Sequence, residues 1–433
     1  MRWDESAMQI EIICTGDEVL TGNIINTNFA YISQKLGDFD FSVKWETTVG
    51  DDREDLLKAF RLAGERADVV IVNGGLGPTV DDLSQEVAAQ AAGVRLVLHE
   101  EWLTRMRDFF TRRGRTMPEN NTKQAMLPEG SEFVDNPIGT ACGFALTIGQ
   151  GRFFFTPGVP RELRRMLENE ILPRLLAMSG VQTVIRLKRF HSYGLGESHA
   201  DALLSGVEAL VPDGSLKLGF RAHYPQLETK LTVRGKDEAD IEAKLAPVIQ
   251  EVYRRMGTYI LAEDEDTLEG VVLAHLTACQ GSLAVIETYT GGQISARLAP
   301  LPAAEAVFRR GVVARDVKEI YAALELDGAA PSKPLTTDVA EHVARAARAR
   351  TGATHALSVF VALDDGADRI DLGGDICLAV ATEDGTVSRY SRLVGGREWV
   401  RLGATEMALD CLRRYLQGLP IRGQNDFEQV AKG

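Results

Sequence analysis

The stretch that decides the fold of this chain, residues 69–82, reads VVIVNGGLGPTVDD. Four β-branched residues in a row, at 69–72, predict a strand that is buried on both faces, as in a parallel sheet. Gly74, Gly75 and Gly77 follow, and because glycine has no Cβ they let the backbone turn tightly and approach a ligand closely. The stretch therefore predicts a buried strand that ends in a ligand-binding turn.

The residues after this turn predict a helix. Leu83, Val87 and Ala91 recur at helical spacing, so the turn leads into a helix N-terminus, where the helix dipole favours an anion. Asp81 and Asp82 repel a phosphate, but they can hold a divalent cation that attracts one. The alternative is that either aspartate only caps the helix. The first interpretation predicts a metal-assisted site for a phosphorylated ligand.

A second turn of the same kind lies upstream. Residues 11–15 predict a strand, and the polar segment 16–28 that follows it is rich in Gly, Asp, Glu and Asn. Phe29, Ile32 and Leu36 then share one face of a predicted helix. Because the carboxyl ends of parallel strands meet at one edge of a sheet, we expect both turns to contribute to one site.

The order of elements predicts the architecture of this part of the chain. We expect strands and helices to alternate, with strands at 10–15, near 41–48 and at 68–73, and helices near 27–37, at 52–65 and at 80–92. This alternation predicts an α/β fold with a doubly wound, mostly parallel sheet. A further turn at 156–160, with Pro160 at the first position of a helix, either cradles the ligand or is only structural.

From about residue 176 the pattern changes. Residues 184–190 and 227–233 alternate apolar and polar side chains, as strands with one wet face do, and residues 237–256 predict an amphipathic helix. The segment 194–196, Gly-Leu-Gly, lacks the spacing of an RNA-clamping loop. We therefore interpret this small α+β region as a spacer or a dimerisation element.

Composition limits the classes of function. At 433 residues the chain is too long for one ordinary core, and two or three domains are expected. No apolar run approaches the length of a membrane span, and residues 1–7 lack the apolar core of a signal peptide, so we expect a cytoplasmic protein that does not bind membranes. The net charge of −14 argues against nucleic acid as a partner. The 5 cysteines form no CxxC pair, which favours reduced thiols.

Several ordered motifs resemble those of the competence/damage-inducible CinA family. The resemblance covers roughly residues 8–175 and rests on GDEVLTGNIINTN (16–28), TVGDD (48–52), NGGLGPTVDD (73–82), PENNTKQA (118–125), NPIGTA (136–141) and TPGVPRE (156–162). It implies a MoaB/Mog-like, molybdopterin-binding-type domain at 8–175, a KH-type α+β domain at 176–262 and an α/β deamidase-like domain at 263–420.

The resemblance also implies an activity for the first domain. Some members of the family hydrolyse ADP-ribose to AMP and ribose 5-phosphate with a divalent metal, so we expect an ADP-ribose pyrophosphatase that uses Mg, Mn or Co and takes a small-molecule nucleotide as substrate. One alternative is a binding protein for molybdopterin or a nucleotide, because a phosphate-binding turn need not hydrolyse what it holds. Another, carried by the family name alone, is an assembly or regulatory protein linked to competence or DNA damage.

These interpretations select candidate site residues. Glu18, Asp81 and Asp82 are the candidates for catalysis and for metal binding, with Glu18 as a further ligand or as the base that activates water. The alternative for Glu18 is a helix-capping carboxylate. The candidates for ligand binding are the polar and glycine positions of the three turns: Gly16, Asn26, Asn28, Gly74, Gly75, Gly77, Pro78, Thr79 and Gly158.

The last domain departs from the family pattern. Where the family's deamidases carry AESCTGG, with Ser as the expected nucleophile, this chain reads IETYTGG, which places Thr288 at the Ser position before Gly291 and Gly292. The family's YSNEAK aligns with residues 315–320, so the Tyr and the Lys are replaced, and Lys318 is expected to point to another face. We therefore expect a degenerate deamidase site without activity on nicotinamide mononucleotide. The remaining role would be ligand sensing or oligomerisation, most simply as a homodimer.

Overall fold

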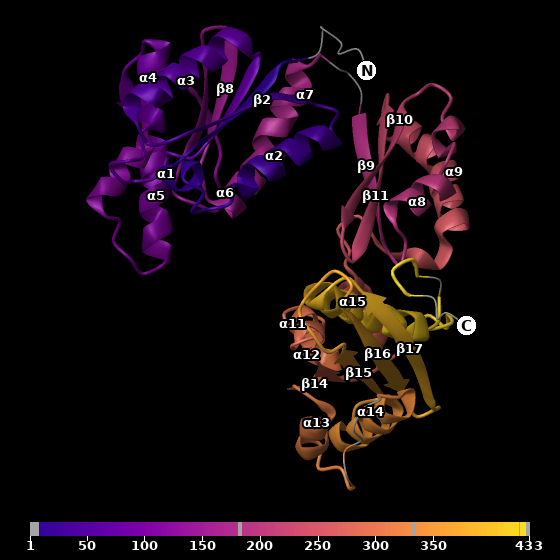
Figure 1. The fold of residues 1–433 in the computed structure, drawn as a ribbon. Helices are drawn as coiled ribbons and strands as arrows, with labels where there is room; N and C mark the ends of the chain where they lie inside the picture. The colour runs from indigo at the N-terminus through magenta and orange to yellow at the C-terminus, as the bar shows by residue number, and fades with distance from the viewer. Residues whose placement is uncertain (1–7, 181–183, 329, 331–334, 424, 430–433) are drawn as a thin grey trace. The chain divides into compact units, whose positions relative to one another are not determined.

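The computed structural model describes residues 8–180, 184–328, 330, 335–423 and 425–429. The chain divides into two compact units, Met1–Thr183 and Val184–Gly433 (Figure 1). The signal-peptide argument concerned residues 1–7, which lie outside the described residues.

A six-stranded sheet of order β2-β1-β3-β8-β7-β6 forms the centre of the first unit. Its strands are β1 Ile10–Thr15, β2 Val43–Val49, β3 Val69–Asn73, β6 Glu132–Val134, β7 Gly143–Ile148 and β8 Gly151–Thr156. The four strands β2, β1, β3 and β8 are parallel, whereas β7 and β6 are antiparallel. The predicted doubly wound, mostly parallel sheet is therefore confirmed. A separate two-stranded sheet pairs β4 (Leu96–Leu98) with β5 (Met126–Pro128).

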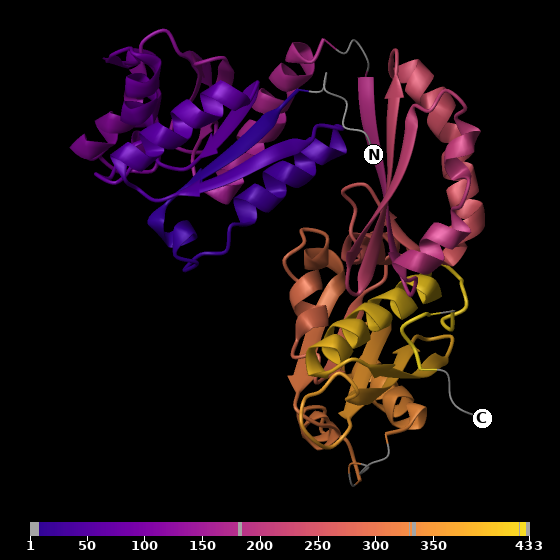
Figure 2. The same ribbon diagram turned by 45° about the horizontal axis from the view of Figure 1, so that its top comes forward.

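Helices cover both faces of this sheet (Figure 2). They are α1 Asp17–Leu20, α2 Thr27–Asp38, α3 Arg53–Arg66, α4 Ser84–Ala92, α5 Glu100–Arg112, η1 Glu119–Ala125, α6 Pro160–Met166, η2 Leu167–Ile171 and α7 Leu172–Met178. Val70 and Val72 of β3 pack against α3, α4 and α5, whereas Val69 and Ile71 pack against α2, α6 and α7. The β-branched run is therefore buried on both faces, as predicted.

One predicted boundary is wrong. The helix expected at 80–92 begins only at Ser84. The Asp82 carboxylate accepts hydrogen bonds from the Thr79 amide (2.9 Å) and the Thr79 hydroxyl (2.5 Å). Residues 79–82 therefore close a turn of their own, because a short polar side chain competes with the helix for backbone partners.

The second unit begins with an antiparallel sheet of order β10-β11-β9-β12. The elements of this middle part are β9 Val184–Tyr193, α8 Glu197–Leu203, η3 Val207–Leu210, β10 Leu216–His223, β11 Gln226–Gly235, α9 Glu238–Met256, η4 Gly257–Tyr259 and β12 Ile260–Glu263. The predicted strands at 184–190 and 227–233 and the helix at 237–256 are confirmed. The apolar face of α9 packs on the sheet through Leu245, Val248 and Val252, all of which are buried.

A five-stranded sheet of order β14-β13-β15-β16-β17 forms the rest of the second unit. Its elements are α10 Leu268–Ala278, β13 Leu283–Thr288, α11 Gln293–Leu298, α12 Ala304–Val307, β14 Phe308–Ala314, α13 Val317–Ala323, α14 Thr337–Thr351, β15 His355–Leu363, β16 Gly373–Ala381, β17 Thr386–Val394 and α15 Arg397–Leu416. The strands β14, β13 and β15 are parallel, and β16 and β17 continue the sheet in antiparallel order.

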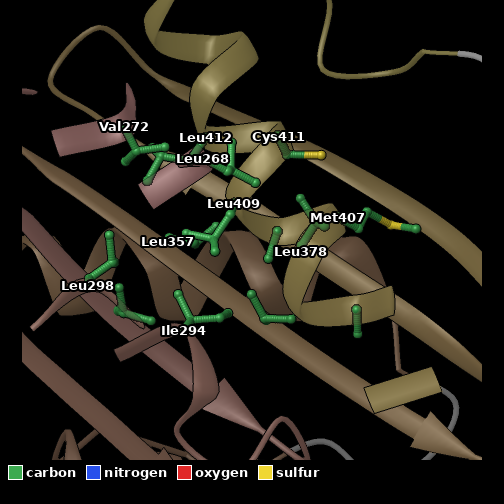
Figure 3. Close-up of a cluster of buried hydrophobic side chains, with 14 of the residues drawn as sticks. Leu268, Val272, Ile294, Leu298, Leu357, Leu378, Met407, Leu409, Cys411 and Leu412 are labelled. Atoms are coloured by element: carbon green, nitrogen blue, oxygen red, sulfur yellow. The ribbon is translucent and has the colours of Figure 1, made fainter. Parts of the chain in front are cut away.

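The core of this part lies on both faces of the sheet. Figure 3 shows the larger cluster, in which Leu409 and Leu412 of α15 pack with Leu268 of α10 and with Leu357 and Leu378 of the sheet. Helices α13 and α14 cover the opposite face. No helix among the described residues combines the length and the apolar character that crossing a membrane requires.

The aromatic core of the first unit yields a stability prediction. Phe155 is fully buried, stacks on Phe144 with ring centroids 4.4 Å apart and meets the edge of Phe60 at 5.4 Å. Phe155→Ala should lower the free energy of unfolding of this unit by about 3–5 kcal/mol, because it leaves a cavity in a packed core. Hydrogen exchange of peptides from β3 and β8 in the full chain measures this loss.

The matched control is Leu62→Ala on α3, whose side chain is 50% exposed. This variant should change the free energy of unfolding of the first unit by less than about 0.5 kcal/mol. Equal losses in the two variants would contradict the assignment of Phe155 to the core.

Candidate functional site

The first unit holds a cavity of about 500 Å³, here called the first pocket, at the carboxyl ends of β1, β3 and β8. It brings together most of the predicted residues: Gly16, Glu18, Gly74, Gly75, Gly77, Pro78, Thr79, Asp81, Asp82 and Gly158. Residues from three separate turns therefore meet at one edge of the sheet, where open α/β sheets bind ligands.

Two predicted contacts, Asn26 and Asn28, do not line the first pocket. Asn26 caps α2, since its side-chain oxygen accepts the Phe29 amide at 3.0 Å. Asn28 donates to the Asn73 side chain (2.8 Å) and to the Gly158 carbonyl (2.7 Å). Both asparagines therefore support the turns around the pocket instead of facing into it.

The glycines of the 74–77 turn are required by its geometry. Gly74 has φ +115° and Gly75 has φ +69°, in a region that side chains rarely adopt. A Cβ at Gly74 would lie 2.5 Å from the Thr15 hydroxyl, and one at Gly75 would collide with the side chain of Ser84. The turn therefore requires glycine at both positions, and both glycines line the pocket.

Five carboxylates line the first pocket: Glu18, Asp51, Asp81, Asp82 and Glu162. Lys, Arg and His are absent from the lining residues that the structure describes. Burial, together with the charges of Asp17, Glu18 and Asp81, raises the pKa of Asp51. Burial also raises the pKa of Glu162. The crowding of negative charge favours a cation or a ligand that brings one.

The predicted three-carboxylate metal site is not assembled in this arrangement. Within the described residues, no group of three or more His, Cys, Asp and Glu side chains could hold a metal ion. One reason is that the Asp82 carboxylate is engaged by Thr79. Mg²⁺, however, is commonly held by only one or two carboxylates together with waters and ligand phosphates. The donor set fits such a metal, and Asp81 and Glu18 are two of the carboxylates that line the pocket.

Several lining residues were missed as site residues. Thr15 is 6% exposed, and its hydroxyl has no hydrogen-bond partner in the part of the chain that the structure describes. Asp51, Gln124 and Glu162 also line the pocket. All three lie inside motifs that carried the family resemblance, which was the available signal, but only the fold could bring segments so far apart in sequence together.

The second unit holds a larger cavity of about 870 Å³, here called the second pocket. It lies at the carboxyl ends of the parallel strands β13, β14 and β15. Its lining includes Thr288, Tyr289, Gly291, Val313, Ala314, Arg315, Asp316, Val317, Lys318, Leu335, Val361, Ala362, Leu363, Asp364, Asp365, Gly366 and Arg397. The region expected to be a degenerate site therefore retains a cavity large enough for a small ligand.

Thr288 is the last residue of β13 and is 2% exposed. Its hydroxyl oxygen accepts the backbone N–H of Val361 at 3.2 Å, which leaves the hydroxyl hydrogen available as a donor. Gly291 lines the pocket, whereas Gly292 precedes α11 and does not. The structure therefore brings two of the three predicted deamidase-site residues, Thr288 and Gly291, into the cavity.

A buried carboxylate fixes the turn after Thr288. Glu287 is fully buried and accepts hydrogen bonds from the Thr290 hydroxyl (2.5 Å), the Ser295 hydroxyl (2.8 Å) and the Ser295 amide (3.2 Å). Tyr289 has φ +62°, an uncommon conformation for a side-chain-bearing residue. Because such a conformation persists only when its surroundings enforce it, the turn is held in one shape at the pocket wall.

The expected position of Lys318 is wrong. Lys318 lines the same cavity as Thr288 instead of pointing to another face. It is the second residue of α13, which begins at Val317, shortly after β14 ends at Ala314, and Ala314 pairs with Thr288 of β13. Strand pairing therefore places the start of α13 beside the end of β13, which gap-free alignment could not reveal.

Three family models match the chain in order. A "Probable molybdopterin binding domain" matches residues 11–177, a "Damage-inducible protein CinA KH domain" matches 187–262, and a "CinA C-terminal domain" matches 265–416. The fold is therefore a MoaB/Mog-like N-terminal domain followed by a KH-like domain and a CinA C-terminal domain.

Relatives match along nearly the whole length. A CinA-like protein from Shewanella amazonensis is 37% identical over 418 residues, which cover 95% of this chain and 96% of that protein. The nicotinamide-nucleotide amidohydrolase PncC from Shewanella oneidensis is 36% identical over 414 residues, which cover 94% of this chain and 96% of that protein. A crystal structure of CinA with unknown function from Thermoplasma acidophilum is 32% identical, covers 39% of this chain and 99% of that chain, and has a TM-score of 0.36.

Two functional predictions from the sequence are corrected by these findings. The ADP-ribose pyrophosphatase prediction is wrong, because a relative that is 36% identical along nearly the whole chain is named an amidohydrolase. The prediction that the C-terminal domain has no deamidase activity is contradicted by the same relative and by the CinA C-terminal match. That prediction rested on the combined replacement of the family's Ser, Tyr and Lys, whereas the fold keeps both a hydroxyl and a cavity at this place.

The identity over the full chain and the order of the three matched domains point to one family. The chain belongs to the CinA family.

Proposed function

We propose that the C-terminal domain hydrolyses the carboxamide of a nicotinamide nucleotide in the second pocket. The observation that carries this proposal is the Thr288 hydroxyl on the wall of an 870 Å³ cavity at the carboxyl edge of parallel strands. The amidohydrolase activity named for the Shewanella oneidensis relative supports the same reaction and substrate class.

The reaction requires a nucleophile and a leaving group. The Thr288 oxygen would attack the carbonyl carbon of the carboxamide, the C–N bond would break, and ammonia would leave with the hydroxyl proton. Water would then hydrolyse the resulting ester to a carboxylate and restore the hydroxyl. The threonine hydroxyl acts as a nucleophile in some enzymes, although the methyl group of threonine restricts the rotamers from which the oxygen attacks.

The turn around Thr288 supports this role. The Val361 amide donates to the Thr288 oxygen at 3.2 Å, and the Glu287 carboxylate fixes the following turn through Thr290 and Ser295. A positioned nucleophile needs little reorganisation before attack, which is a main source of enzymatic rate. The rigid turn therefore suits nucleophilic catalysis better than it suits a flexible binding surface.

A second candidate function concerns the first pocket. We propose that it binds a phosphorylated small molecule together with a divalent cation, Mg²⁺, Mn²⁺ or Co²⁺. The specific observation is a cavity lined by five carboxylates and by the glycines of the 74–77 turn. The cation would neutralise the charge between carboxylates and phosphate, with Asp81 and Glu18 as its protein ligands. The molybdopterin-binding description of the matching domain model favours molybdopterin as the first ligand to test.

The first prediction concerns the nucleophile. Thr288→Ala should reduce ammonia release from nicotinamide mononucleotide to background, because the attacking oxygen is removed. Thr288→Ser should keep or raise the rate, because the oxygen remains and the methyl group that hinders attack is gone. Ammonia release by the purified full chain measures both.

The control for this experiment is Thr277→Ala on the exposed side of α10, which lies outside the pocket lining. It should leave the rate unchanged. Turnover by Thr288→Ala at the rate of the parent protein would rule out Thr288 as the nucleophile.

The next prediction concerns the cation. Asp81→Asn should weaken Mn²⁺ binding to the full chain about tenfold or more, because a lost charged ligand removes attraction in a site with few protein ligands. Calorimetry with Mn²⁺ in the presence and absence of inorganic pyrophosphate measures the effect. The control Asp108→Asn, on α5 and outside the pocket lining, should bind Mn²⁺ as the parent does. Unchanged binding in Asp81→Asn would remove Asp81 from the metal site.

A further inference from the structure

We propose that Arg315 and Lys318 form an anion subsite at the rim of the second pocket, which holds the phosphate of the nucleotide while its carboxamide lies against Thr288. The inference deepens the proposed amidohydrolase function and rests on it for the identity of the ligand. It assigns a role to two residues that the sequence motifs left without one.

The lining residues of the second pocket fall into two groups by burial: a buried floor and an exposed rim. Thr288 is 2% exposed, whereas the side chains of Arg315 and Lys318 are exposed and line the same cavity. A phosphate that keeps part of its hydration shell is bound at lower cost at a rim than at a buried floor. A nucleotide would therefore enter with its base first and leave its phosphate at the rim.

The strand register keeps the rim within reach of the floor. Thr288 pairs with Ala314 on the neighbouring parallel strand, and Arg315 directly follows Ala314. Lys318 is the second residue of α13. Both cationic side chains therefore start from the same edge of the sheet as Thr288, and one small ligand can contact the floor and the rim together.

The charges of the rim are available to a ligand. In the part of the chain that the structure describes, neither the side chain of Arg315 nor that of Lys318 takes part in a hydrogen bond or an ion pair. Of the three carboxylates in the pocket lining, Asp316 accepts the Glu319 amide at 3.0 Å and Asp364 accepts Arg392 at 2.7 Å, and Asp365 also has an interaction partner in the structure.

The chemistry of the pair matches a phosphate. A guanidinium presents a fork of donors that fits phosphate oxygens, and an ammonium adds a point charge. Among the described residues, no carboxylate pairs with either side chain, so both cations would remain unpaired until an anion binds. The subsite therefore favours phosphorylated over unphosphorylated ligands in the same pocket.

The experiment compares four ligands by calorimetry on the full chain: nicotinamide mononucleotide, nicotinamide riboside, nicotinate mononucleotide and nicotinate riboside. The variants are Arg315→Gln and Lys318→Gln, each carrying Thr288→Ala so that no ligand is consumed. Each variant should weaken the binding of both mononucleotides about tenfold and leave the binding of both ribosides unchanged, because charge-assisted hydrogen bonds to phosphate are lost. Arg309→Gln, an exposed arginine of β14 outside the pocket lining, is the matched control and should change nothing.

Other outcomes overturn the proposal. Equal weakening of ribosides and mononucleotides would show that the side chains support the pocket without binding phosphate. If the substitutions weaken the binding of the two nicotinate ligands but not of the two nicotinamide ligands, the subsite binds the nicotinate carboxylate instead of a phosphate. If no ligand binds, the subsite is refuted. If mononucleotide binding depends on Arg315 and Lys318 but the parent chain releases no ammonia, the subsite is supported and the proposed reaction fails.

Discussion

Parallel β-strands end at the same edge of their sheet, and both pockets of this chain depend on that constraint. In the first unit the ends of β1, β3 and β8 bring Glu18, Asp81 and Glu162 to one cavity. In the second unit the ends of β13, β14 and β15 bring Thr288 and Lys318 together. In each case the buried strands fix the positions of the turns, and the turns carry the polar chemistry.

Buried polar side chains hold these turns in shape. In the first unit, Asn73 donates to the Thr156 hydroxyl and the Pro157 carbonyl, and Ser84 donates to the Gly74 carbonyl. In the second unit, Glu287 accepts several hydrogen bonds from the turn that follows Thr288. Such groups are costly when unpaired in a low-dielectric interior, so a satisfied network favours one conformation of the turn over others.

The second unit has a further buried network, which joins its middle sheet to helices of the C-terminal part. Arg297 of α11 contacts Glu269 of α10 and Glu406 of α15, and Gln226 of β11 donates to Glu406 at 2.5 Å. Burial raises the pKa of Glu406 despite these partners. Because removing one partner of a buried charged pair is strongly destabilising, this network ties the middle sheet to helices α10, α11 and α15.

The sequence by itself determined the parallel architecture, the strand at Val69–Val72 and the glycine turn, because local periodicity and the lack of a Cβ are properties of neighbouring residues. It also identified most lining residues of the first pocket. Tertiary structure alone decided that Asn28 donates to the Gly158 carbonyl beside the first pocket and that Lys318 shares a cavity with Thr288. These outcomes depend on strand pairing and on competition for hydrogen-bond partners between distant segments, which no local pattern encodes.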